Sequence, residues 1–236
     1  MADRYPKLRA KVIDVLNSAP CQKISFYYAG RRFDGVGFTR VARAVEIGKL
    51  RGHGINVDVD TRLRQRKAEA MYSRETDTLI FPDPEYGADD DRIFPTSAIV
   101  HECAHALLDG LAVPPTPNAR YQLDDIPAID DEVAAFVAGW LYASYEIDAR
   151  EARRLKADGV SVTVTVDVPP TRRGAHAWAR TVAAKIKDKP GSEIPDDADL
   201  ASLKVAILAS PTYRGLRAMY EHDQRDTYGY PGIKDF

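Results

Sequence analysis

Apolar and polar positions in the first third of the chain form patterns that predict short helices and strands. Apolar residues recur at helical spacing over 4–18, and a second helix is predicted over 38–50. The regular alternation of INVDVD over 55–60 predicts a half-buried strand. Residues 68–83 predict a hairpin, because two strand-like stretches flank the polar turn Arg74–Asp77. This part of the chain therefore combines helices with a small sheet.

Two later stretches are apolar around most of their helical circumference. We predict helices over Phe94–Leu111 and over Asp130–Ile147, and the second opens with acidic residues that interact favourably with the helix dipole. A helix that is apolar on nearly every side is buried in a protein core. The ionisable side chains of His101, Glu102 and His105 inside the first of these helices therefore need a chemical reason.

The last third of the chain adds further predicted elements. They are a strand over 160–168, helices over 174–187, over 198–210 and around 213–222, and a linker over 188–197. The whole pattern predicts an α+β fold in which a small, mostly antiparallel sheet packs on the two apolar helices, with additional helices around them. We expect a core over residues 1–150 and a C-terminal α/β extension over 151–236 packed on it, and a single domain remains an alternative.

Composition narrows the functional classes. The chain has 236 residues, of which 44% are hydrophobic, and a net charge of −2, which gives no indication of nucleic acid or of an anionic membrane as a partner. Its first residues lack the apolar segment of a signal peptide, and no run is long enough to span a membrane. We expect a cytoplasmic protein, with export that needs no cleavable signal as an alternative. The two cysteines do not form a disulfide framework.

The motif His101-Glu102-Cys103-Ala104-His105 is the most informative stretch of the sequence. Two histidines four residues apart lie one helical turn apart on the same face, so both imidazoles can bind one metal ion. The glutamate beside the first histidine can reach a water activated by that metal and act as its general base without being a ligand. A catalytic zinc ion takes three protein ligands, so a third must come from elsewhere in the chain.

Glu132 is the best candidate for the third ligand. No histidine lies between His105 and His176, which excludes a third histidine shortly after the motif. Glu132 follows His105 by 27 positions, in the first turn of the next apolar helix. Small residues that follow it, such as Ala135 and Gly139, allow two helices to approach closely. Its neighbours in the DDE sequence, Asp130 and Asp131, remain alternative ligands.

The HExxH motif and the stretch Glu132–Ala138 together resemble the gluzincin branch of the HExxH zinc metallopeptidases, or zincins. The resemblance covers residues 68–147 and extends loosely to compact bacterial zinc peptidases that cleave helix-turn-helix repressors. It departs from that group at Tyr142-Ala143-Ser144, where the group usually has leucine-methionine-proline. It implies a zincin-like fold with an edge strand for extended substrates, Zn²⁺ as cofactor, and His101, His105 and Glu132 as ligands.

The implied activity is hydrolysis of a peptide bond in a protein or peptide substrate, with Glu102 as general base. Candidate donors to the oxyanion are His176, Tyr121, Tyr142 and Tyr145, and an exposed helix position is the alternative for His176. Asp109 could either hold a ligand imidazole from behind or cap its helix. Two other functions remain open: a zincin-like regulatory or interaction protein that binds metal without catalysis, and a toxin-type effector protease.

Overall fold

The computed structural model describes residues 4–48, 54–65, 69–74, 76–89, 92–109, 128–158, 163–168 and 173–210. The described residues form eight helices and six strands, which confirms the α+β class. The helices are α1 (Pro6–Asn17), α2 (Ala19–Gln22), α3 (Gly35–Ile47), α4 (Arg62–Gln65), α5 (Ile93–Leu108), α6 (Ala128–Asp158), α7 (Arg173–Ile186) and α8 (Ala198–Ala209). The strands are β1 (Ser25–Tyr28), β2 (Arg31–Asp34), β3 (Asn56–Val59), β4 (Met71–Ser73), β5 (Thr78–Phe81) and β6 (Ser192–Glu193).

The strands form two three-stranded sheets, with the orders β2-β1-β6 and β3-β5-β4. In each sheet a hairpin supplies one antiparallel pair, and a strand from elsewhere in the chain adds a parallel pair: β6 beside β1, and β3 beside β5. The expectation of one mostly antiparallel sheet is therefore wrong. The sequence pattern identified β3, β4 and β5 but not β1, β2 or β6, and it carries no information on the direction of a non-local partner.

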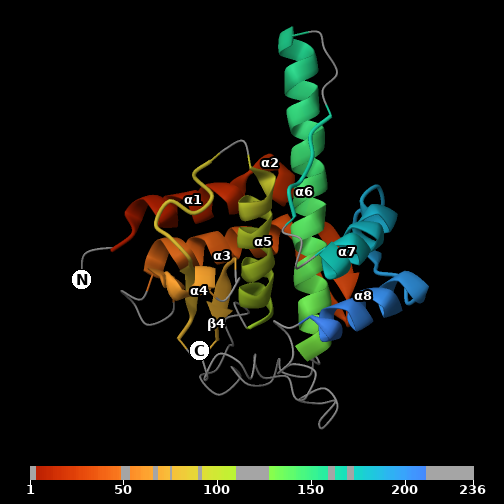
Figure 1. Ribbon diagram of the computed structural model, residues 1–236, viewed down its shortest axis with the longest axis horizontal. Helices are drawn as coiled ribbons and strands as arrows, with labels where there is room; N and C mark the ends of the chain where they lie inside the picture. The colour runs from red at the N-terminus through yellow and green to blue at the C-terminus, as the bar shows by residue number, and fades with distance from the viewer. Residues whose placement is uncertain are drawn as a thin grey trace.

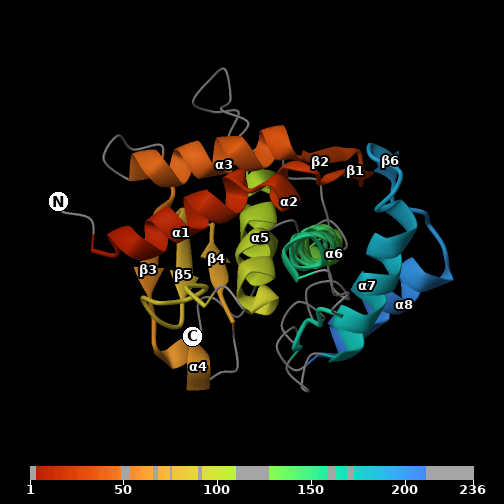
Figure 2. The same ribbon diagram turned by 90° about the horizontal axis from the view of Figure 1, so that it is seen from above.

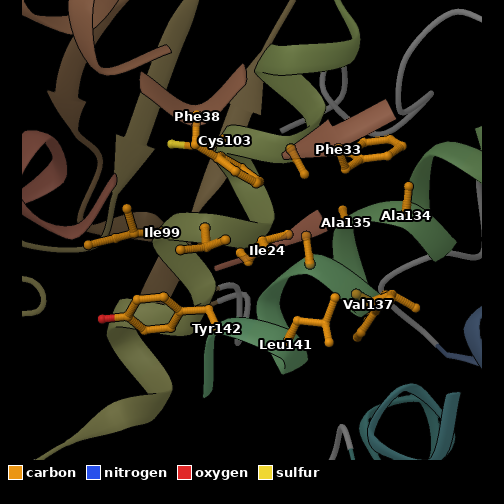
Figure 3. Close-up of a cluster of buried hydrophobic side chains, with 14 of the residues drawn as sticks. Ile24, Phe33, Phe38, Ile99, Cys103, Ala134, Ala135, Val137, Leu141 and Tyr142 are labelled. Carbon is orange, nitrogen blue, oxygen red and sulfur yellow. The ribbon is translucent and has the colours of Figure 1, made fainter. Parts of the chain in front are cut away.

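Helix α5 lies between the sheet β3-β5-β4 and helix α6 (Figure 2). Helices α7 and α8 pack on the far side of α6, and the C-terminal part of α6 projects beyond the other helices (Figure 1). Side chains from both central helices meet those of the N-terminal elements in one buried cluster (Figure 3). The labelled members of this cluster are Ile24, Phe33, Phe38, Ile99, Cys103, Ala134, Ala135, Val137, Leu141 and Tyr142.

The contact between α5 and α6 is close because α6 presents a glycine to α5. A Cβ atom added at Gly139 would lie 3.0 Å from the backbone oxygen of Ser97 and 3.5 Å from the Cβ of His101. The alanines Ala135 and Ala138 are also fully buried on α6. These small side chains allow the two backbones to approach at the level of the first motif histidine.

Several predicted elements differ from the structure. Helix α6 continues past Ile147 to Asp158, because strong helix formers follow and Glu146 pairs with Arg150 and Arg153 along the helix. Residues 163–168 form no strand. The predicted linker over 188–197 contains β6, which is a strand of a sheet.

Helix α6 also runs through the expected boundary at residue 150. The division into a core and an extension stays a prediction. The helix expected around 213–222 lies outside the described residues. Among the described helices, none has the length and the apolar character needed to cross a membrane.

The close approach at Gly139 generates a first prediction. Replacing Gly139 by Val places methyl groups against the Ser97 carbonyl and should lower the free energy of unfolding by about 1–3 kcal/mol. Thermal unfolding measures the effect, with Gly174→Val in α7 as the matched control. A Cβ at Gly174 would meet no atom of the described residues within 4 Å. Equal melting temperatures for the two variants would contradict a tight contact.

Candidate metal centre

The two motif histidines lie on one face of α5, as the spacing predicts. Their Nε2 atoms are 3.2 Å apart, and the ring planes are nearly perpendicular, at 78°. His105 is fully buried, whereas 12% of the His101 side chain is exposed. The ring of His101 also packs edge-on against Phe136 of α6, at 4.8 Å between centroids. Both nitrogen atoms therefore converge on one point with little freedom to turn away.

Helix α6 brings Glu132 to the same point. Its Oε2 lies 3.7 Å from the Nε2 of His101, and its Oε1 lies 3.6 Å from the Nε2 of His105. Tetrahedral zinc with ligand bonds of about 2.0–2.2 Å needs ligand atoms about 3.3–3.6 Å apart. The nearest separations are close to that range, with each imidazole facing a different oxygen of Glu132. One ligand atom from each of the three residues lies within 4.8 Å of the other two. His101, His105 and Glu132 could therefore hold a metal ion.

Asp131 supports the cluster from behind rather than joining it as a ligand. Its Oδ1 lies 2.7 Å from the Nδ1 of His105. An ionised carboxylate can only accept a hydrogen bond, so Nδ1 is the donor, and Nε2 is the ring nitrogen that faces Glu132. Asp131 therefore has the supporting role that the sequence had suggested for Asp109.

The nearby charges shift the pKa values of both His105 and Asp131. Burial favours the neutral imidazole, but the carboxylates of Asp131 and Glu132 outweigh it and raise the pKa of His105 to about 9. Burial alone would raise the pKa of Asp131, but His105 and Arg74 lower it below its usual value.

Arg74 and Tyr72, from β4 and the turn after it, connect the remaining carboxylates. Arg74 donates through Nη2 to Asp131 Oδ2 at 3.3 Å, and its Nε lies 3.3 Å from Asp109 Oδ1. The hydroxyl of Tyr72 lies 3.1 Å from Asp109 Oδ2 and 3.3 Å from Asp77 Oδ1, and its single hydrogen is shared between these two acceptors. Asp109 occupies the C-cap position of α5, which was the alternative role for it. Burial raises the pKa of Asp109 to about 6, against the opposing effects of Arg74 and Tyr72.

Glu102 lies beside the cluster without joining it. Its Oε1 is 4.0 Å from the Nε2 of His101, and its Oε2 accepts a hydrogen bond of 2.8 Å from the backbone N–H of Tyr72 in β4. The side chain is 10% exposed. One oxygen is therefore fixed by the strand, while the other faces the ligand group. This is the position that the motif predicts for a general base.

Three of the four candidate oxyanion donors, Tyr142, Tyr145 and His176, lie in the described part of the chain. Tyr145 donates to the backbone oxygen of Lys187 at 2.7 Å, and Tyr142 belongs to the buried hydrophobic cluster of Figure 3. His176 is half-buried rather than exposed, and it accepts a hydrogen bond of 3.0 Å from Trp140 Nε1. Its ring packs against Phe136, which links it to His101 through one aromatic side chain. Tyr121 lies outside the described residues.

Comparison with known proteins finds no relative: no family model, no curated protein and no solved structure matches this chain. Function must therefore be inferred from the geometry of the site.

The raised pKa of Asp109 generates a prediction for stability. An unfolded aspartate has a pKa of about 3.9, so Asp109 binds its proton more tightly in the folded state. Its stabilising contribution is complete below pH 4 and is lost as the pH rises through about 6. Relative to Asp109→Asn, the parent should lose up to about 3 kcal/mol of unfolding free energy over that interval.

Urea unfolding between pH 4 and pH 8 in the presence of a chelator measures this difference. The exposed carboxylate of Glu85 provides a control through Glu85→Gln. Parallel pH profiles for the parent and Asp109→Asn would show that burial does not control this carboxyl group.

Proposed function

We propose that this protein is a zinc-dependent metallopeptidase. The observation that carries the proposal is the convergence of His101, His105 and Glu132 beside the carboxylate of Glu102. The two Nε2 atoms lie 3.2 Å apart, and each has one oxygen of Glu132 at 3.6 or 3.7 Å. Two imidazoles and one carboxylate form a ligand set used by catalytic zinc. Three protein ligands leave a coordination position open for chemistry, whereas structural zinc sites almost always have four.

Bound zinc supplies Lewis-acid activation of water and of a carbonyl oxygen. The protein residues supply the proton transfers and the geometry. Glu102 takes a proton from the attacking water through Oε1, the oxygen on the side of His101, and it delivers that proton to the leaving amine. A C–O bond forms, the C–N bond of the peptide breaks, and one water is consumed. The Tyr72 N–H restricts the rotation of the carboxylate during both transfers.

The position of Glu102 also supports a peptidase over a metal-binding protein without activity. A site that only stores or senses metal has no need for a buried carboxylate next to its ligands, because burial of a charge is unfavourable. Here the carboxylate is 10% exposed and is held by the backbone of β4. This arrangement favours catalysis over simple metal binding.

Metal content tests the ligand set directly. The purified parent, loaded with Zn²⁺ and dialysed, should retain about one zinc ion per chain, and His105→Ala and Glu132→Ala should lose it because three ligands are needed. Asp130→Ala is the matched control, because Asp130 lies in the same first turn of α6 but pairs with Tyr28 and Lys204.

Each alternative result has a defined meaning. If Glu132→Ala keeps its zinc while His105→Ala loses it, the third ligand would be assigned to Asp131 instead of Glu132. A parent that binds no zinc would contradict the metal centre as a whole.

Hydrolysis of a mixture of fluorogenic peptides tests the role of Glu102. Glu102→Gln should keep its zinc but lose activity by at least about 100-fold, because removal of a general base typically reduces the rate by a factor of about 10²–10⁴. The exposed Glu85→Gln serves as the control and should keep full activity. Equal activity of Glu102→Gln and the parent would contradict the assigned mechanism.

A further inference from the structure

We propose that Arg74 is a positioning residue of the metal centre, holding Asp131 in the orientation that directs His105 toward the metal. The proposal rests on the metal site of the proposed function and adds a residue that the HExxH pattern does not contain. Arg74 lies outside the ligand cluster and acts through Asp131.

The chain of contacts has three links. Glu132 faces His105 Nε2 at 3.6 Å, the opposite ring nitrogen of His105 lies 2.7 Å from Asp131 Oδ1, and Arg74 Nη2 binds Asp131 Oδ2 at 3.3 Å. Each oxygen of Asp131 therefore has its own partner. A carboxylate held at both oxygens cannot rotate, so it determines the plane of the imidazole that it accepts from.

When a metal binds, the positive charge of Arg74 becomes the main compensation for the carboxylate of Asp131. A histidine that coordinates a metal uses a neutral imidazole, so it no longer offers Asp131 a full positive charge. Asp131 is buried, and a buried carboxylate needs a cation nearby to remain ionised. Arg74 is the cation that the described contacts place on it, and a guanidinium keeps its charge at any pH of interest.

Arg74 also connects β4, whose Tyr72 N–H binds Glu102, with the two central helices α5 and α6. Its Nε lies 3.3 Å from Asp109 at the end of α5, and its Nη2 reaches Asp131 in the first turn of α6. Tyr72, two residues earlier, binds Glu102 through its backbone and Asp109 through its hydroxyl. The planar guanidinium suits this bridge because its N–H bonds point in fixed and different directions, toward both carboxylates. The short segment from Tyr72 to Arg74 thus holds the general base directly and the ligand His105 through Asp131.

Zinc affinity, measured by competition with a chelator of known affinity, tests the proposal without reference to peptidase activity. Arg74→Met and Asp131→Asn should each weaken Zn²⁺ binding by about 10- to 100-fold, the range typical of residues that support a metal-binding histidine. Because both act through one contact, the double variant should bind no more weakly than Asp131→Asn alone. The visible absorption of bound Co²⁺ should shift in Arg74→Met, because the coordinating imidazole turns.

Arg150→Met is the matched control. Arg150 also forms a partly buried ion pair, with Glu146 at 2.7 Å, and 14% of its side chain is exposed compared with 18% for Arg74. This control should keep parental zinc affinity. If Arg74→Met does not fold, as judged by circular dichroism, Arg74→Lys replaces it. A single ammonium group cannot reach both carboxylates, so this variant should fall between the parent and Asp131→Asn.

The outcomes separate this proposal from the peptidase proposal. Parental zinc affinity in Arg74→Met, or effects of Arg74→Met and Asp131→Asn that multiply in the double variant, would overturn the role of Arg74 and leave the peptidase proposal intact. A parent that binds zinc but cleaves no peptide would overturn the peptidase proposal and leave Arg74 in its role. A parent without zinc affinity would overturn both.

Discussion

The close packing of α5 against α6 is the constraint on which the candidate site depends. The two motif histidines lie on one helix and Glu132 on the other, so the distance between the helices determines the distances between ligand atoms. Gly139 sets this distance at the level of His101, where the Ser97 carbonyl lies 3.0 Å from the position that a Cβ would occupy. Metal–ligand bonds tolerate deviations of only about 0.2 Å, so a small displacement of either helix would separate Glu132 from the histidines functionally.

The same packing buries several carboxylates, and burial of a charged group is unfavourable unless the group has hydrogen-bond or ion-pair partners. Glu102, Asp109, Asp131 and Glu132 all lie at or near the interface of α5, α6 and β4, and each is at most 17% exposed at its side chain. Hydrogen bonds from the Tyr72 backbone, the Tyr72 hydroxyl, His105 and Arg74 compensate three of these carboxylates. Glu132 faces the two imidazoles. A divalent cation among them would add positive charge where the carboxylates are concentrated, which is consistent with a metal centre.

Local patterns predicted the six longer described helices and the β4–β5 hairpin, because repeated apolar spacing follows from the geometry of each element. They missed the short helices α2 and α4 and the hairpin β1–β2. They failed where partners come from distant parts of the chain. The short strand Ser192–Glu193 has no pattern of its own and exists because it pairs with β1. Residues 163–168 alternate in sequence but take no regular structure, although Val164, Val166 and Val168 pack partly against the core. Alternation therefore indicated burial of one face there, and not a strand.

The sequence by itself determined the spacing of His101, Glu102 and His105, because hydrogen bonds within one helix fix which side chains share a face. It also indicated Glu132 through the small residues that follow it. Only the tertiary structure decided that Glu132 lies within 3.7 Å of both imidazoles, that Asp131 rather than Asp109 supports His105, and that Arg74 joins them. The physical reason is that these contacts join a strand and two helices whose relative positions depend on packing between residues far apart in the chain. No local repeat carries that information.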